Sequence, residues 1–233
     1  MNCWASCLGN CTDISSGEHY VSAGIFRDNT KAVLVSGLKW MNTESQAIGL
    51  PRAVAKILCS EHNNSLSEFD NEACKLSEFL RQIKTNPLKK YSIEINGKYI
   101  EKWAIKTFYN LGVLGVFNET ILPQDNLVRY IYCDSEIDRG AGLYFVRSRI
   151  FNKDNGDYVY WHAIKNKSGK GDVIGMQFYI SGLCFIINLN PVHYDDIKLE
   201  SYFCDNNEIY YRPEFIIFDN ENNSNVNKIT FKW

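Results

Sequence analysis

Three cysteines near the start of the chain and a cysteine–histidine pair near residue 60 have the types and spacing of metal ligands. The first group reads Cys3-x3-Cys7-x3-Cys11, and the second reads Cys59-x2-His62. A structural zinc ion is usually held by four sulfur or imidazole ligands in a tetrahedron. We therefore predict one zinc site made from Cys59, His62 and two of the three N-terminal cysteines. The spacing leaves the choice among Cys3, Cys7 and Cys11 open.

The other cysteines lie within apolar helical or strand-like patterns, where a thiol behaves as a small hydrophobic group. They are Cys74, Cys133, Cys184 and Cys204. Residues Met1 to Ile14 lack the basic start and apolar core of a signal peptide, and no stretch approaches 18 apolar residues. We expect a cytoplasmic protein without membrane contact. In that reducing compartment, spaced cysteines more often bind metal than form disulfides.

Between the two cysteine groups, Glu18 and His19 place an acid directly before a base, and Asn63 directly follows the last predicted zinc ligand. Imidazole titrates closest to neutral pH, so His19 is the candidate general base for activating water. Carboxylate and amide oxygens, as in Glu18 and Asn63, are suitable ligands for a divalent cation such as magnesium. An activated water and a divalent cation are together the requirements of metal-assisted hydrolysis.

Together these segments resemble the HNH, or ββα-metal (His-Me finger), endonuclease family in its zinc-stapled form. The stretch LCSEHNNSLSEFD, residues 58–70, is similar to the family's LC-x-x-HN-x-x-LS-x-x-D helix entry, and the resemblance covers about residues 3–80. It implies that the zinc is structural, that His19 is the general base, and that Glu18 and Asn63 bind a catalytic Mg²⁺ or Mn²⁺. Asn42 is the nearest candidate for the family's middle Asn, which helps to orient the base histidine.

The resemblance implies a metal-dependent endonuclease that hydrolyses phosphodiester bonds of nucleic acid, with DNA as the expected substrate. The alternative is a zinc-stapled module that binds nucleic acid or protein without catalysis. A net charge of −2, from 25 Lys and Arg against 27 Asp and Glu, favours that alternative and excludes a general electrostatic coat. Nucleic-acid contacts would need a local basic patch. The basic residues nearest the finger are Arg52, Lys56, Lys89, Lys90 and Lys98, and the sequence leaves homo-oligomer formation open.

Residues before position 113 alternate between helical and strand-like patterns. Apolar residues at spacings of three and four predict a helix over 66–86, which the sequence Asn86-Pro87 ends. Alternation over 91–100 around Asn96-Gly97 predicts a β-hairpin. A helix over 101–111 is expected to pack on this hairpin.

The rest of the chain reads as short strands separated by polar turns. The expected strands are 127–133, 143–150, 157–164, 172–180, 183–189 and 214–218, with an earlier strand at 31–36, a helix near 51–58 and a polar loop at 220–227. We therefore expect an α+β fold in two domains. A zinc-stapled ββα-metal nuclease module would occupy 1–86, and a β-rich, sandwich-like domain that recognises substrate or partner would occupy 87–233.

Overall fold

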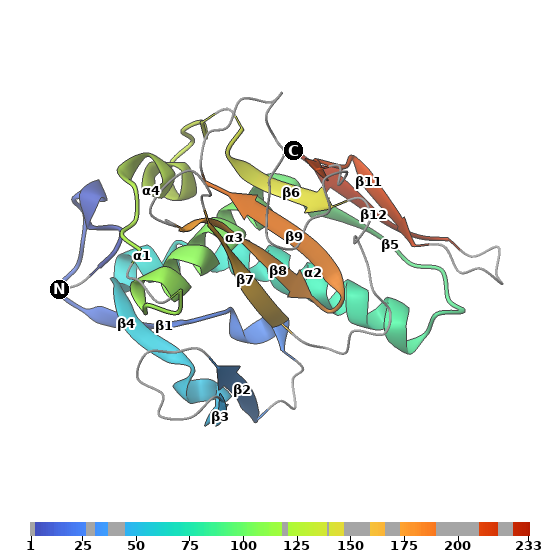
Figure 1. Cartoon of the computed structure of the whole chain (residues 1–233), viewed down its shortest axis with the longest axis horizontal. Helices are drawn as coiled ribbons and strands as arrows, with labels where there is room; N and C mark the ends of the chain where they lie inside the picture. The colour runs from blue at the N-terminus through green and yellow to red at the C-terminus, as the bar shows by residue number, and fades with distance from the viewer. Residues whose placement is uncertain are drawn as a thin grey trace. The chain divides into compact units, whose positions relative to one another are not determined.

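The computed structural model describes residues 3–26, 31–36, 45–117, 121–138, 140–146, 159–165, 173–189, 210–218 and 226–233. Over these residues the chain has a mixed α+β fold, as predicted (Figure 1). It divides into two units that are each discontinuous in sequence. Unit 1 comprises residues 1–71 and 102–137, and unit 2 comprises residues 72–101 and 138–233. In the described part of the chain, no helix is long and apolar enough to cross a lipid bilayer.

Unit 1 is built on an antiparallel strand pair that leads directly into a short helix. Strand β1 (Ser15–His19) pairs with β4 (Val54–Cys59), and helix α1 (Ser60–Asn64) follows β4 without a connecting loop. The other elements of this unit are the 3₁₀ turns η1 (Ser6–Leu8), η2 (Ala23–Ile25) and η3 (Leu50–Arg52), the antiparallel strands β2 (Ala32–Ser36) and β3 (Ser45–Gly49), and helix α4 (Asp125–Tyr132). Helices α2 (Ser67–Thr85) and α3 (Gly97–Val113) each contribute residues to both units.

Two elements of unit 1 differ from the prediction. The helix expected near residues 51–58 is instead η3 followed by β4, because the segment pairs with β1 and buries three successive residues, Ile57 to Cys59, at its end. The strand expected over 127–133 is helix α4. An apolar run of this length also suits a strand, but the residues that α4 buries lie one, three and four positions apart, on one helical face. They are Leu127, Val128, Tyr130 and Ile131.

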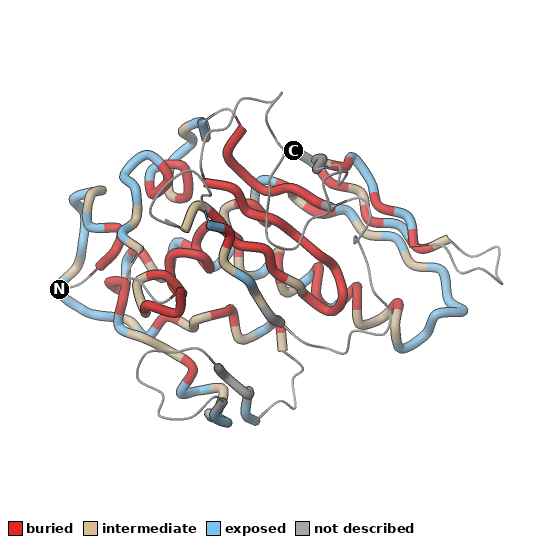
Figure 2. Tube along the Cα trace, viewed as in Figure 1, coloured by how far each residue is buried: buried red, intermediate tan, exposed pale blue. Residues whose placement is uncertain are grey.

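The predicted helix over 66–86 is confirmed as α2, whose apolar stripe from Phe69 to Ile83 is buried (Figure 2). The hairpin predicted around Asn96-Gly97 is wrong. Strand β5 (Ser92–Asn96) ends there, and α3 begins at once. The Asn96 side-chain oxygen accepts a hydrogen bond from the backbone N–H of Tyr99 at 3.1 Å, so Asn96 caps a helix instead of forming a turn. Gly97 is required because a Cβ there would lie 2.6 Å from the Trp233 ring.

Unit 2 contains two sheets. The first is antiparallel and has the strand order β10 (Tyr210–Tyr211), β6 (Gly142–Val146), β9 (Leu183–Asn188), β8 (Val173–Ile180), β7 (Val159–Lys165). The second has the order β11 (Phe215–Phe218), β12 (Asn227–Lys232), β5, and β12 runs parallel to β5. The rings of Phe145 and Phe231 join the sheets at a centroid distance of 5.1 Å. The predicted strands in this region are confirmed where they are described, whereas β10 and β12 were not predicted and residues 147–150 and 219–225 lie outside the described range.

The expected boundary between residues 86 and 87 falls inside unit 2. Strand β5, which lies just beyond that boundary, pairs along its whole length with β12 near the end of the chain. Helix α3 then carries the chain back into unit 1. A segment ending at residue 86 would therefore lack the part of α3 that belongs to unit 1.

The cap at Asn96 can be tested by substitution. Asn96→Ala removes the acceptor for the Tyr99 N–H and should lower the free energy of unfolding by about 1 kcal/mol. Asn96→Asp keeps an acceptor oxygen and serves as the matched control, with stability close to wild type. Chemical denaturation of the three proteins makes the comparison. Equal stability of the alanine and aspartate variants would argue against the cap.

Candidate metal centre

Four side chains from three places in the sequence converge in unit 1. The ligand atoms of Cys3, Cys11, Cys59 and His62 all lie within 4.8 Å of one another. The distances from His62 Nδ1 to the three sulfurs are 3.3 Å for Cys3, 3.6 Å for Cys11 and 3.1 Å for Cys59. Ligand bonds of about 2.3 Å to sulfur and about 2.0 Å to nitrogen around a tetrahedral zinc separate ligand atoms by roughly 3.5 Å. The spacing and the S₃N donor set therefore fit a metal ion such as zinc.

Local structure brings the four ligands together. Cys59 ends β4 and caps α1, so His62 lies one turn further along the helix, and its N–H reaches the Cys59 sulfur at 3.5 Å. The N-terminal segment is attached at both ends. The Trp4 N–H donates to the Ile57 carbonyl at 3.0 Å, and the Ser60 N–H donates to the Ile14 carbonyl at 2.9 Å. These contacts hold an irregular segment beside the β4–α1 junction.

The second imidazole nitrogen of His62 also has a partner. Its Nε2 lies 2.7 Å from the Asn10 side-chain oxygen. That oxygen can only accept, so Nε2 carries the proton and Nδ1 presents its lone pair to the sulfurs. A hydrogen bond of this kind commonly orients a metal-binding histidine. Sequence reasoning missed Asn10, and its position beside Cys11 was the signal that could have found it.

The thiols of the cluster differ in acidity. Burial opposes ionisation of Cys59, but hydrogen bonds from the backbone N–H groups of His62 and Thr12 and from Cys3 lower its pKa to about 7. Much of Cys11 is exposed, yet burial of its sulfur beside Cys3 and Cys59 raises its pKa to about 12. Thiolates this close repel one another, so a bound cation would be needed to keep all of them ionised.

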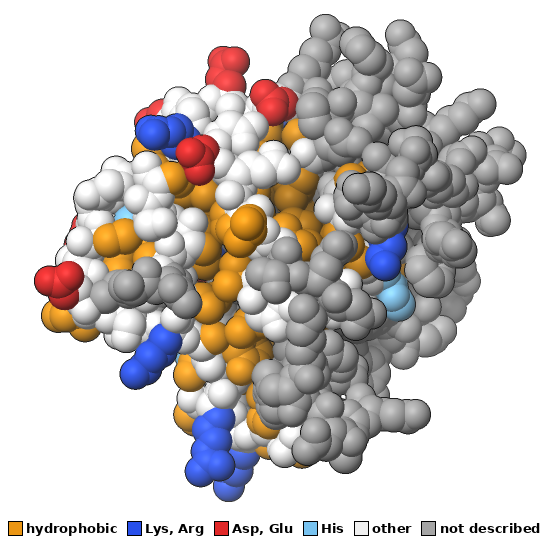
Figure 3. All heavy atoms as spheres, turned by 60° about the vertical axis from the view of Figure 1, so that its left-hand side comes forward, with side chains coloured by type: hydrophobic (Ala, Val, Ile, Leu, Met, Phe, Trp, Pro, Cys, Tyr) orange, Lys and Arg blue, Asp and Glu red, His pale blue; other side chains and the backbone are white. Residues whose placement is uncertain are grey.

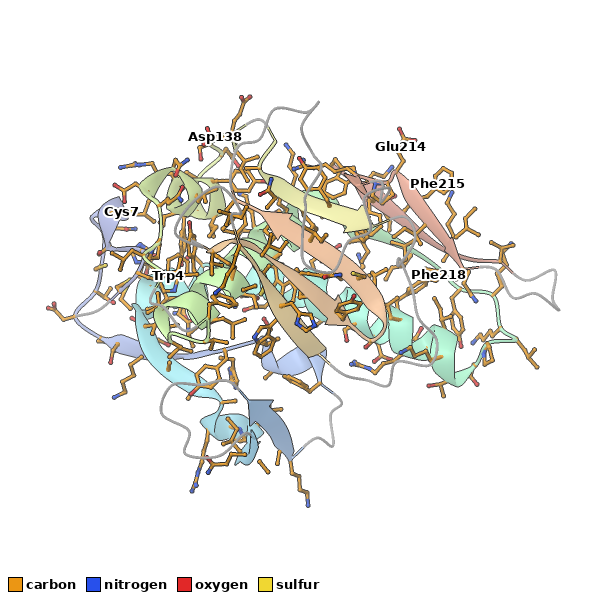
Figure 4. The ribbon with its side chains drawn as sticks, in the orientation of Figure 1. Trp4, Cys7, Asp138, Glu214, Phe215 and Phe218 are labelled. Atoms are coloured by element: carbon orange, nitrogen blue, oxygen red, sulfur yellow. The ribbon has the colours of Figure 1, made fainter. Side chains whose placement is uncertain are left out.

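Cys7 lies outside the cluster. It sits on η1, which contacts α4, and Figure 4 shows it near that helix and apart from Trp4. Burial and the neighbouring carboxylate of Asp125, which also hydrogen-bonds the thiol, raise its pKa. Of the three N-terminal cysteines, the structure therefore brings Cys3 and Cys11 to Cys59 and leaves Cys7 beside α4.

Single substitutions should separate the ligands from Cys7. Cys3→Ser, Cys11→Ser, Cys59→Ser and His62→Ala should each lose the metal ion, because structural zinc binds with about 10–16 kcal/mol and depends on all four ligands. Cys7→Ser is the matched control and should keep one ion per chain. Elemental analysis of the purified proteins gives the metal content. Metal retained by Cys11→Ser but lost from Cys7→Ser would show that Cys7, and not Cys11, is the fourth ligand.

A buried ion-pair cluster lies beside the candidate catalytic strand. Lys106, on α3, is 1% exposed, and its ammonium lies 2.6 Å from the Glu18 carboxylate and 2.6 Å from the Asp70 carboxylate. The Ser22 hydroxyl donates to Asp70 and accepts from the indole N–H of Trp103, the latter at 2.8 Å. Burial raises the pKa of Glu18, although the charge and hydrogen bond of Lys106 act in the opposite direction.

This environment does not agree with the expected role of Glu18 as a ligand of a divalent ion. Its carboxylate is buried and occupied by Lys106 and by the Asn110 side-chain N–H at 3.0 Å. Sequence reasoning missed Lys106 and Asn110 because they lie on α3, outside the expected finger. Trp103, Lys106 and Asn110 are spaced three and four residues apart, which places them on one helical face. A lysine and an asparagine within an apolar helical stripe were the available signal.

The other candidate catalytic residues, His19 and Asn63, each have a polar group that is not paired within the described part of the chain. His19 ends β1 half-buried, and its imidazole has no hydrogen-bond partner among the described residues. Since neighbours on a strand point to opposite faces, His19 points away from the Glu18 face. The Asn63 side-chain N–H donates to the Ser16 hydroxyl at 2.8 Å, and its oxygen has no partner within the described part of the chain. Asn42 lies outside the described residues.

The basic residues expected near the finger are exposed but belong to different units. Arg52 and Lys56 lie in unit 1, whereas Lys89, Lys90 and Lys98 lie in unit 2. On the face drawn in Figure 3, the Lys and Arg side chains of the described residues form separate small groups. The five residues are therefore divided between the two units.

The Lys106 cluster should be sensitive to the loss of one charge. Lys106→Met leaves the buried Glu18 carboxylate without its cation and should lower the free energy of unfolding by about 3–5 kcal/mol. Glu18→Gln added to Lys106→Met removes the more deeply buried of the two carboxylates that lose Lys106, since Asp70 is partly exposed, and should recover at least half of that loss. Urea denaturation of metal-loaded protein measures both. A double variant no more stable than Lys106→Met alone would show that the pair does not depend on charge.

Comparison with protein-family models, with curated proteins and with solved structures gave no match.

Proposed function

We propose that the chain is a metal-dependent endonuclease of the HNH type, with a ββα finger stapled by a structural zinc ion. The observation that carries the proposal is the order of β1, β4 and α1 with the Cys3, Cys11, Cys59 and His62 cluster at the β4–α1 junction. Zinc at this cluster would fasten the N-terminal segment to the start of the helix. It would take no part in the reaction.

The chemistry is proposed for His19 and Asn63. A neutral His19 imidazole can accept the proton of a water molecule as that water attacks a phosphodiester. The oxygen of Asn63, which has no partner among the described residues, can contribute to a Mg²⁺ or Mn²⁺ site, and the side-chain N–H contact with Ser16 orients that oxygen. A divalent ion, when bound, supplies positive charge to the scissile phosphate. Glu18 is not proposed as an ion ligand. Its buried carboxylate instead attaches β1 to α3 through Lys106 and Asn110.

Recognition of nucleic acid, expected to be DNA, is assigned to the β-rich unit 2. Its two sheets contact each other through Phe145 and Phe231, as the two layers of a sandwich-like domain would. The exposed lysines of this unit, Lys89, Lys90 and Lys98, are available for phosphate contacts.

Nicking of supercoiled plasmid by the full chain, loaded with zinc and supplied with Mg²⁺ or Mn²⁺, tests the proposal. His19→Ala should lower the cleavage rate by about 10²- to 10⁴-fold, the usual contribution of a general base. His162→Ala is the matched control, because this exposed histidine lies on β7 in unit 2 and should leave the rate unchanged. Asn63→Ala should regain part of its activity at raised Mg²⁺, whereas no Mg²⁺ concentration should rescue His19→Ala.

Zinc content must be measured on the same samples. Equal cleavage by His19→Ala and wild type, with zinc retained in both, would contradict the assignment of the base. Loss of zinc from His19→Ala would instead make His19 a structural residue.

One observation favours a second function, a zinc-stapled module that binds nucleic acid or protein without catalysis. The carboxylate expected beside His19 is held by Lys106, and the side-chain N–H of Asn63 donates to the Ser16 hydroxyl. Neither contact brings an acidic ligand to His19. Salt-dependent DNA binding without nicking, unchanged in His19→Ala, would support this second function over the first.

A further inference from the structure

Asn110 lies where the metal centre, strand β1 and helix α3 meet. It is 0% exposed, and its side-chain amide has three partners. Its oxygen accepts from the indole N–H of Trp4 at 3.1 Å, and its N–H₂ group donates to the Glu18 carboxylate at 3.0 Å and to the His19 backbone carbonyl at 3.1 Å. Every hydrogen of this amide group is therefore used.

The chemistry of the three partners fixes which side chain can stand at this position. The Trp4 indole can only donate, whereas the Glu18 carboxylate and the His19 carbonyl can only accept. An amide supplies one acceptor and two donor hydrogens from a single group, so it satisfies all three. Aspartate would lose both donors and place a second anion against Glu18. An apolar side chain would remove all three hydrogen bonds and leave the buried Trp4 indole N–H without its acceptor.

Trp4 connects this amide to the metal ligands. It is the residue after Cys3, whose sulfur lies 3.3 Å from His62 Nδ1. The Trp4 backbone is tied to Ile57 of β4, and its ring packs against Tyr109 and Tyr132 at centroid distances of 5.8 Å each. A metal ion that fixes Cys3 would therefore restrict the indole that orients the Asn110 amide.

We infer that Asn110 is a positioning residue that couples occupancy of the metal centre to the end of strand β1, where His19 lies. The inference rests on the proposed zinc site and deepens the proposed function. In the metal-bound chain, Cys3 holds Trp4, Trp4 holds the amide, and the amide holds the Glu18 carboxylate and the His19 carbonyl. Without metal, Cys3 is released, and the end of β1 loses part of its support. Coupling of this kind acts equally in both directions, so loss of Asn110 weakens metal binding.

Amide hydrogen exchange measures the coupling without any need for catalysis. The Tyr20 N–H, which donates to the Ala53 carbonyl at 3.1 Å just after β1, is the reporter. The Leu189 N–H, bonded to Ile174 in unit 2, is the internal reference. In wild type, zinc should slow exchange at Tyr20 by about five- to 150-fold, the usual range of coupling between sites. Leu189 should change far less.

Two substitutions remove the hydrogen bond between Trp4 and Asn110, one at the acceptor and one at the donor. Asn110→Ala and Trp4→Phe should each abolish most of the zinc-dependent slowing at Tyr20 and weaken zinc binding, measured by chelator competition, by a similar factor. Their effects should not add in the double variant, because both remove the same connection. Thr107→Val is the matched control on α3. Its hydroxyl is buried and has no hydrogen-bond partner among the described residues, so the variant should behave as wild type.

The outcomes are distinct. Zinc-dependent slowing in Asn110→Ala equal to that in wild type would overturn the inference and leave Asn110 a stabilising residue only. If Asn110→Ala fails to fold, Trp4→Phe decides, since it keeps the ring and removes only the indole N–H. Equal exchange rates of the Tyr20 N–H in zinc-loaded and metal-free wild type would also overturn the inference. Coupling without plasmid cleavage would leave the inference standing and contradict the proposed nuclease.

Discussion

The arrangement of unit 1 depends on the close approach of three thiols and one imidazole whose ligand atoms all lie within 4.8 Å. Such a set is unfavourable as free thiolates, because like charges repel and burial penalises each of them. A cation removes both costs and turns the set into a cross-link. The cross-link joins an irregular N-terminal segment to the junction of β4 and α1. A region with so little regular structure has a small core of its own, so the ion would supply much of its stability.

A second polar cluster supports the same unit from inside. Lys106 and Asn110 of α3 together satisfy a buried carboxylate and a strand-end carbonyl, and Asp70 of α2 completes the charge pairing. Buried groups of this kind are costly unless all are paired, so the α3 face and the β1 strand depend on each other. This dependence explains why unit 1 takes residues 102–137 as well as 1–71. The metal cluster and the Lys106 cluster meet at Asn110 and Trp4.

The sequence indicated much of this site and some of the fold. The metal-ligand types and spacing at Cys59 and His62 are local, and helix α2 follows from a local apolar period, so both could be predicted. The choice of Cys3 and Cys11 over Cys7 could not, because it depends on how the chain between them turns and on Asp125. The sequence Asn96-Gly97 suits a tight turn as well as a helix cap. The helix follows because β5 pairs with the distant strand β12 and not with the residues after Gly97. The role of Glu18 likewise depended on Lys106, which lies 88 residues away in sequence.

X-ray absorption at the zinc edge, on the full chain purified with its metal, tests the central claim most directly. The S₃N set of Cys3, Cys11, Cys59 and His62 predicts three sulfur neighbours at about 2.3 Å and one nitrogen at about 2.0–2.1 Å. The same spectrum should be found for Cys7→Ser. A first shell of oxygen and nitrogen alone, or one of four sulfurs that falls to three in Cys7→Ser, would contradict the account.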